Sequence, residues 1–251
     1  MLLPIGVVLG IVAMIGWGTA DFFAAKAVRK TSVLRTFFWS QFIGMLLFVV
    51  ASILWFGLPQ ITLALLWLLV LCSVLGVTGY LAFYKGLQVG KVCIVSPIAA
   101  CWAVVTVLLS LLFLHETLTP FQGAGVGLAI IGAVLTSFRL SDIKQLKLSK
   151  VQAGVVYALL AMISWGVYLT LVGVLIDKLG WFFPLVLIKA TFMVLLVLFF
   201  SIRRVNISFP RRVASTVFLV GVFEFVAFMA YGYGVNSAFN SIVAPVAAAF
   251  P

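Results

Sequence analysis

Long apolar stretches, separated by short polar segments, follow one another along the whole chain. Several exceed 18 residues, which is enough for a helix to cross the hydrocarbon core of a bilayer. They mostly lack the polar face that a helix on the surface of a soluble domain shows. The pattern therefore predicts an all-α polytopic membrane protein. The expected membrane helices cover residues 5–25, 34–56, 62–86, 93–114, 120–139, 153–176, 182–202 and 212–234, with a ninth beginning near Asn240.

Local signals refine these boundaries. Thr119 and Gln122 form a predicted capping box around Pro120, which suits the first turn of a helix. Pro97 is expected either to begin the regular part of its helix or to kink it. Pairs of glycines four residues apart, Gly6 with Gly10 and Gly123 with Gly127, predict faces on which neighbouring helices pack closely.

The chain also repeats itself. Residues 5–18 and 153–166 are identical at eight of fourteen positions, at an offset of 148. The same offset aligns residues 82–100 with 230–248, at seven of nineteen positions. We interpret the chain as a tandem duplication of a five-helix unit. Because five is odd, the second unit enters the membrane from the opposite side, which predicts the inverted repeats typical of secondary transporters.

The duplication sets the expected domain boundaries. The first repeat covers residues 1–140, a polar linker covers 141–152, and the second repeat covers 153–251. At the same offset Pro251 corresponds to Ala103, after which the first repeat continues for another 37 residues, 104 to 140. We therefore expect a ten-helix fold whose last one and a half helices are missing from these 251 residues, and a reading frame that continues beyond them.

The charges predict an orientation. The net charge is +11, and 14 of the 16 basic residues fall on the face that would carry the loops 26–35, 87–92, 140–152 and 203–211. These bases lie in short loops between helices, so membrane orientation explains them better than nucleic-acid binding. The positive-inside rule places that face in the cytoplasm and the N-terminus outside. We expect a multi-pass protein of the cytoplasmic membrane.

Composition excludes several functions. Hydrophobic residues make up 65% of the chain and charged residues 8%, far from the quarter that is usual in soluble domains. The three cysteines lie in apolar segments without a CxxC spacing, so no disulfide, metal site or cofactor is expected. With one histidine and no pair of membrane carboxylates at helical spacing, the chain is not expected to be an enzyme.

Three motifs resemble the EamA repeat of the drug/metabolite transporter superfamily. They are the Trp-Gly pairs at 17–18 and 165–166, the segments 94–97 and 242–245 that end in proline, and residues 115–119 followed by a glycine-rich helix. The resemblance implies ten helices around a central cavity. It also implies movement of small metabolites, often the export of amino acids or related compounds.

Polar residues inside the membrane helices are candidates for substrate binding or coupling. Glu224 lies near the middle of its helix, where a carboxylate is costly, and it could couple protons, bind a cation or form a structural pair. Lys189 could neutralise Glu224, bind a substrate carboxylate, or extend its side chain to the interface. Gln41 occupies the matching position of the first repeat. Antiparallel neighbouring helices are expected to bring Lys189 and Glu224 together.

Deep aromatic residues complete the candidate set. Trp17 and Trp165 are repeat partners too deep for an aromatic belt, so they line a cavity or pack the core. The same alternatives apply to Tyr80, Tyr84 and Tyr231. Two other acids have structural interpretations: Asp21 as an ion pair with Lys26 or Arg29 at the interface, and Glu116 as an electrostatic contact at the nearby helix terminus.

These observations predict a secondary transporter that moves a small metabolite, such as an amino acid or drug-like compound, by alternating access, with export as the expected direction. The expected partners are the small-molecule substrate and the lipid bilayer, with protons as a coupling ion and a homodimer left open. Two alternatives remain. A flippase for lipid-linked substrates would have a lateral opening with basic residues near the headgroups, and a non-transporting assembly subunit would have a filled core.

Overall fold

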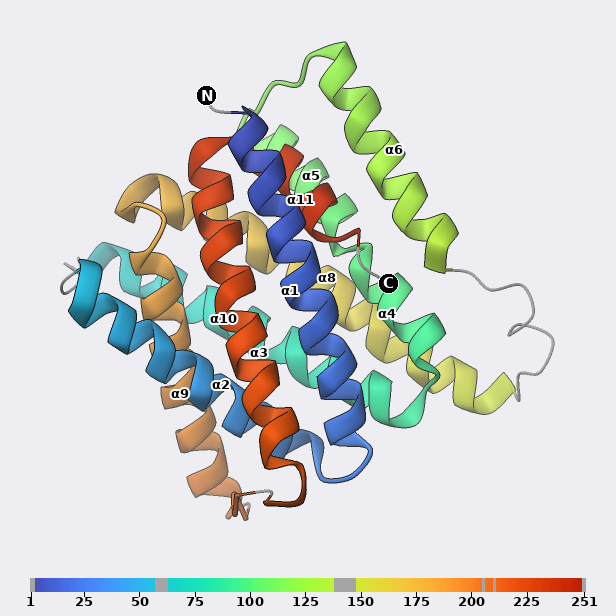
Figure 1. The fold of residues 1–251 in the computed structure, drawn as a ribbon, viewed down its shortest axis with the longest axis vertical. Helices are drawn as coiled ribbons and strands as arrows, with labels where there is room; N and C mark the ends of the chain where they lie inside the picture. Colours follow the sequence, from blue (N-terminus) through green and yellow to red (C-terminus); the bar gives the residue numbers. More distant parts are fainter. Residues whose placement is uncertain (1–2, 57–62, 138–147, 205, 210, 250–251) are drawn as a thin grey trace.

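The structure is a computed structural model that describes residues 3–56, 63–137, 148–204, 206–209 and 211–249, and these residues form helices without strands (Figure 1). Within these described ranges, seven helical segments are long and apolar enough to cross a membrane. The helices are α1 (Leu3–Val28), α2 (Val33–Ala51) with a π-helical turn η1 (Ser52–Phe56), α3 (Leu63–Val89), α4 (Val92–Ala100), α5 (Trp102–Phe113), α6 (Pro120–Ser137), α8 (Leu148–Leu179), α9 (Phe183–Arg203), η2 (Arg211–Val213), α10 (Ala214–Ser237) and α11 (Asn240–Ala247).

The predicted helices are present, with boundaries that shift by a few residues. The capping box at the start of α6 is confirmed, because the Thr119 N–H donates to Gln122 Oε1 at 2.9 Å and the Gln122 N–H donates to Thr119 Oγ1 at 3.3 Å. The largest difference is at α8, which begins at Leu148. Residues 148–152 of the predicted linker are therefore helical, whereas 138–147 lie outside the described residues.

The helix predicted over 93–114 is interrupted. Pro97 lies inside α4 and not at its beginning, and the chain leaves regular helix at Cys101 before α5 starts. Proline has no N–H to give to the preceding turn, which weakens the helix around it. The Cys101 N–H bonds to Ile98 O at 3.2 Å, a tighter turn of three residues. Of the two roles predicted for Pro97, the structure therefore favours the kink.

Helix packing follows the predicted duplication. Helix α1 lies along α10, and α3 lies along α8 (Figure 1). In the predicted repeats α1 and α8 are corresponding first helices, and α3 and α10 are corresponding third helices. The corresponding pair α2 and α9 are also in contact. Exchanging the two halves therefore preserves these contacts, although the opposite orientation of the repeats in a membrane stays a prediction.

Of the two predicted glycine faces, one packs against neighbouring helices and the other does not. A Cβ at Gly6 would lie 2.4 Å from Ala238 Cβ and one at Gly10 would lie 3.0 Å from Val246, so this face packs α1 closely against the C-terminal helices. At Gly123 and Gly127 no described atom lies within 4 Å of where a Cβ would lie. The predicted packing face on α6 is thus wrong within the described residues. Helix α6 contacts α4 and α11 at the margin of the bundle (Figure 1).

Candidate functional site

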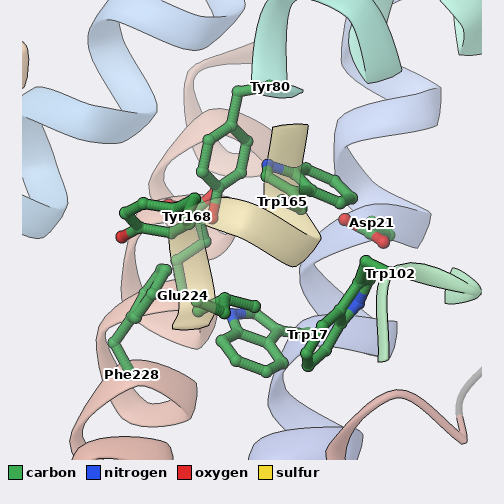
Figure 2. A pocket seen from close by; sticks show the side chains of 9 residues that line it. Trp17, Asp21, Tyr80, Trp102, Trp165, Tyr168, Glu224 and Phe228 are labelled. Carbon is green, nitrogen blue, oxygen red and sulfur yellow. The ribbon is translucent and has the colours of Figure 1, made fainter. Parts of the chain in front are cut away.

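A cavity of about 30 Å³ lies among α1, α3, α5, α8 and α10 (Figure 2). Polar space of this size holds one or two water molecules, so this conformation has no room for a metabolite. Aromatic rings and two carboxylates form most of the wall. The lining residues are Trp17, Asp21, Tyr80, Trp102, Trp165, Tyr168, Leu169, Glu224 and Phe228.

The cavity lies deep in the helices. Glu224 is in the middle of the apolar span Arg211–Ser237, and Trp165 is close to the middle of the span Ala153–Leu179. Trp17 is similarly central in the span Pro4–Val28. Residues so far from either helix end are expected at the centre of a bilayer.

Corresponding positions of the two predicted repeats both contribute to the wall of this cavity. Three pairs of lining residues are separated by 148 positions: Trp17 with Trp165, Tyr80 with Phe228, and Asp21 with Leu169. The first pair is identical and the second is aromatic in both halves. The third breaks the symmetry, because only the first repeat carries an acid there.

Glu224 in the wall forms one cluster with two buried polar side chains behind it, Gln41 and Lys189. Lys189 Nζ donates to Gln41 Oε1 at 2.5 Å and lies 3.3 Å from Glu224 Oε2. Gln41 Nε2 donates to the same carboxylate oxygen at 2.7 Å. Lys189 and Glu224 are each 2% exposed and Gln41 is 0% exposed. The predicted contact between Lys189 and Glu224 is therefore present, and Gln41, the repeat partner of Lys189, joins it.

Aromatic rings surround the lysine ammonium group. Lys189 Nζ lies 4.5 Å from the centroid of the Phe228 ring, 5.5 Å from Phe192 and 5.6 Å from Tyr80. The electron-rich faces of aromatic rings attract cations. The carboxylate, the amide and these rings together compensate for burying the charge.

Packing explains why the repeat partner of Glu224 is a glycine. A Cβ at Gly76 would lie 2.3 Å from Cζ of Phe192 and 3.3 Å from Tyr168. A side chain there would displace a ring that contacts the Lys189 ammonium group. The acid is therefore confined to one repeat.

The predicted site residues divide into three groups. Trp17, Tyr80, Trp165 and Glu224 line the cavity, while Gln41 and Lys189 lie directly behind Glu224. Tyr84 and Tyr231 are buried but are not part of the wall. The Tyr84 ring packs 5.9 Å from Phe37 and 6.1 Å from Tyr80, and the Tyr231 ring packs 5.2 Å from Trp17.

Two acids differ from their sequence interpretation. Asp21 was expected to pair with Lys26 or Arg29, but it lines the cavity, and the described residues place no ion pair on it (Figure 2). Its position four residues after Trp17, on the same helix face, was the signal that could have found it. Lining residues Trp102, Tyr168, Leu169 and Phe228 were also missed. They resemble the many other apolar and aromatic residues of the chain.

Glu116 acts on a different helix from the one expected. Its two carboxylate oxygens accept the backbone N–H groups of Asn240 and Ser241 at 3.0 and 2.9 Å, at the first turn of α11. The Asn240 side chain in turn accepts the Tyr231 hydroxyl at 2.6 Å and donates to Leu169 O at 3.1 Å. Glu116 thus connects the α5–α6 segment to a helix that contacts the wall of the cavity.

Comparison with known proteins agrees with this geometry. The model of the EamA-like transporter family matches residues 4–138. The chain belongs to this family. It is 33% identical over 131 residues to the uncharacterized protein MJ1333.1 of Methanocaldococcus jannaschii, covering 52% of this chain and 95% of that protein. A solved crystal structure has the same fold, with a TM-score of 0.73 at 16% identity, over 98% of this chain and 84% of the other.

Membership confirms the resemblance seen in the motifs. With seven helical segments able to span a bilayer, this EamA-family chain is a multi-pass membrane protein of a transporter family. The structure explains why a glycine follows the tryptophan in the Trp-Gly pair at 165–166. A Cβ at Gly166 would lie 2.3 Å from Val105 Cβ, so the glycine of this Trp-Gly pair lets α5 approach α8 closely. That approach brings Trp102 and Trp165 into the same wall.

The two tryptophans of the EamA motifs have a second feature in common, which concerns their indole N–H groups. Among the described residues, the indole Nε1 atoms of Trp17 and Trp165 are buried without a hydrogen-bond partner, in side chains 7% and 8% exposed. Buried donors of this kind are costly unless a partner satisfies them. The residues that line the cavity therefore include two unpaired indole N–H donors as well as two carboxyl groups.

Proposed function

We propose that this EamA-family protein is a secondary transporter that moves a small metabolite across the cytoplasmic membrane by alternating access, with an amino acid or drug-like compound as substrate and export as direction. One observation carries the proposal: a cavity with ionisable groups in its wall lies at mid-helix depth, where α1 and α3 of the first predicted repeat meet α10 and α8 of the second. A substrate site between repeats can be exposed first to one side of a membrane and then to the other.

The closed state of the cavity supports this cycle. Its volume of about 30 Å³ excludes a metabolite, so binding requires the walls to separate. Matched side chains from the two repeats form much of the wall, and relative movement of the repeats would separate them. The structure then corresponds to a conformation of the cycle in which the cavity is narrow.

We infer that Glu224 couples this movement to protons. In the closed state its carboxylate stabilises the Lys189 ammonium group at 3.3 Å and accepts a hydrogen bond from Gln41. Protonation would remove the negative charge and leave Lys189 buried without its counter-ion. Because a buried cation without a partner is unfavourable, protonation would favour states in which Lys189 meets water or a substrate carboxylate.

A flippase is the second candidate, because one observation favours it. An open groove between α2, α3 and α8 is lined by apolar residues and contains Lys85 and Gln88 near one end. A basic residue in such a groove could receive the headgroup of a lipid-linked substrate. An assembly subunit is less well supported, because the cavity with Asp21 and Glu224 in its wall differs from the filled core expected for that role.

Transport by the purified protein in liposomes tests the proposal. A panel of radiolabelled amino acids, sugars and cationic drugs would be offered with and without a pH gradient. We expect one solute class to accumulate only with the gradient. Glu224→Gln should abolish accumulation while substrate exchange survives, and Asp177→Asn, at an exposed carboxylate, should leave both unchanged.

Two results would contradict the proposal. Unchanged pH dependence in the Glu224→Gln variant would place the coupling site elsewhere. If no solute of the panel crosses but a fluorescent lipid moves between leaflets, the groove and not the cavity carries the function.

A further inference from the structure

The charges around the central cavity do not balance. Two carboxylates line it, those of Asp21 and Glu224. Lys189 pairs with Glu224 at 3.3 Å, and this is the salt bridge that the described residues contain. Asp21 has neither an ion pair nor a hydrogen bond among them, and both Lys26, on the same helix, and Arg29, just after its end, are exposed. Among the described residues, the cavity thus has one carboxyl group without a cationic partner.

The rest of the wall is suited to a cation. Three tryptophans, two tyrosines and a phenylalanine surround the space (Figure 2). Two of these rings already hold an ammonium group, because Lys189 Nζ lies 4.5 Å from the Phe228 centroid and 5.6 Å from the Tyr80 centroid. The faces of two rings in the wall therefore already contact one ammonium group of the protein, that of Lys189.

The wall also discriminates between kinds of cation. A metal ion requires several oxygen ligands at short range, whereas most of this surface is aromatic carbon. Ring faces favour weakly hydrated organic cations, of which alkylammonium groups are the main example. Asp21 would act as the anion that fixes the cation among the rings.

We propose that the cavity binds an organic cation, an alkylammonium or quaternary ammonium group, with Asp21 as its counter-ion and the aromatic rings as its walls. This inference rests on the proposed transport function and specifies its substrate class. Entry of such a group requires the rings to separate from their closed spacing, because the closed cavity measures only about 30 Å³. Binding and opening of the repeats are therefore parts of one event.

Equilibrium binding of radiolabelled choline to the purified full chain tests the inference. We expect unlabelled tetramethylammonium to displace choline. The uncharged isostere 3,3-dimethylbutan-1-ol should compete about tenfold or more less well, because it has the same shape without the charge. Sodium at the same ionic strength should not compete.

Variants assign the binding to this wall. Asp21→Asn should weaken choline binding about tenfold or more, whereas Asp21→Glu should keep much of it and Asp177→Asn all of it. Trp102→Leu should weaken binding and Trp102→Phe should restore most of it, because phenylalanine keeps a ring face. Thermal unfolding of each variant shows that it is folded.

Several outcomes would overturn the inference: no choline binding by the unmodified protein, equal competition by the uncharged isostere, competition by sodium, or full affinity in Asp21→Asn. The proposed transport function fails separately. Transport of an uncharged or anionic solute that ignores Asp21→Asn would overturn the cation site and leave the transporter. Choline binding with no transport of any solute would overturn the transport function and leave the cation site.

Discussion

Lys189 and Glu224 are stable inside the protein only because each is close to the other. Both are almost completely buried, and the low dielectric of the surroundings makes an unpaired charge expensive. Gln41 contributes by accepting from Lys189 and donating to Glu224 at the same time. The amide thus satisfies both members of the pair without adding charge.

Removing one charge of this pair should destabilise the protein more than removing both. Lys189→Met keeps most of the side-chain volume but leaves the Glu224 carboxylate without a cation, at an expected cost of about 3–5 kcal/mol. The double variant Lys189→Met with Glu224→Gln should recover most of the loss, because an amide has no charge to neutralise. Thermal and denaturant unfolding in detergent measure the stability of the single and of the double variant.

Glu224→Gln alone completes this thermodynamic cycle. If the three variants lose stability additively, the two side chains do not interact, and their contact contributes nothing to folding.

The first turn of α11 depends on a residue 124 positions away. The first N–H groups of a helix have no partner within it, and Glu116 accepts two of them. Its negative charge also complements the positive end of the helix dipole. His115, with a φ of 52°, turns the chain just before Glu116. The short α5–α6 segment therefore orders the start of a helix in the other half.

Loss of this cap should be visible locally. Glu116→Ala removes both acceptors and should destabilise the protein by about 1–2 kcal/mol, with Glu116→Gln intermediate. Hydrogen exchange should accelerate at the amides of Asn240 and Ser241. Thr119→Ala is the matched control, because it removes the cap of α6 and should accelerate exchange there instead. Unchanged exchange at α11 in Glu116→Ala would mean that other groups hold this end.

Hydropathy was enough to place the helices, because bilayer-spanning length and apolar composition are local properties. It was not enough to place the break at Cys101, since Pro97 is compatible with both a helix start and a kink. The role of Glu116 was missed for a different reason. A capping box is recognised by residues three positions apart, as at Thr119 and Gln122, whereas this cap joins segments distant in the sequence.

The candidate site was predictable where residues are rare in their surroundings. Buried Lys189 and Glu224 stand out in apolar helices, and the repeat singled out Gln41 and the two tryptophans. Trp102 and Phe228 do not stand out in a chain with 14% aromatic residues. Asp21 was misassigned because its distance from the end of its helix suggested an interface, and only the packing of five helices shows what it faces.

The orientation predicted from the distribution of bases is open to direct measurement. In a variant without the native cysteines, an impermeant maleimide added to intact cells should not label Asn206→Cys, which lies in the exposed loop after α9. It should label Lys178→Cys, which is exposed in the last turn of α8, close to the start of α9 and so at the opposite end of that helix from Asn206. The positive-inside rule predicts this asymmetry, and the reverse labelling pattern would invert the topology.

The contact between Gln41 and Lys189 has an evolutionary consequence. These residues occupy the same position of the repeated unit, 148 residues apart, and they touch. In a dimer of unfused, identical units, the same side chain would meet itself at this point. Two glutamines can pair there, but two buried lysines would repel each other. The lysine, and the acid that compensates for it, therefore belong to a period after the two halves had become free to mutate separately.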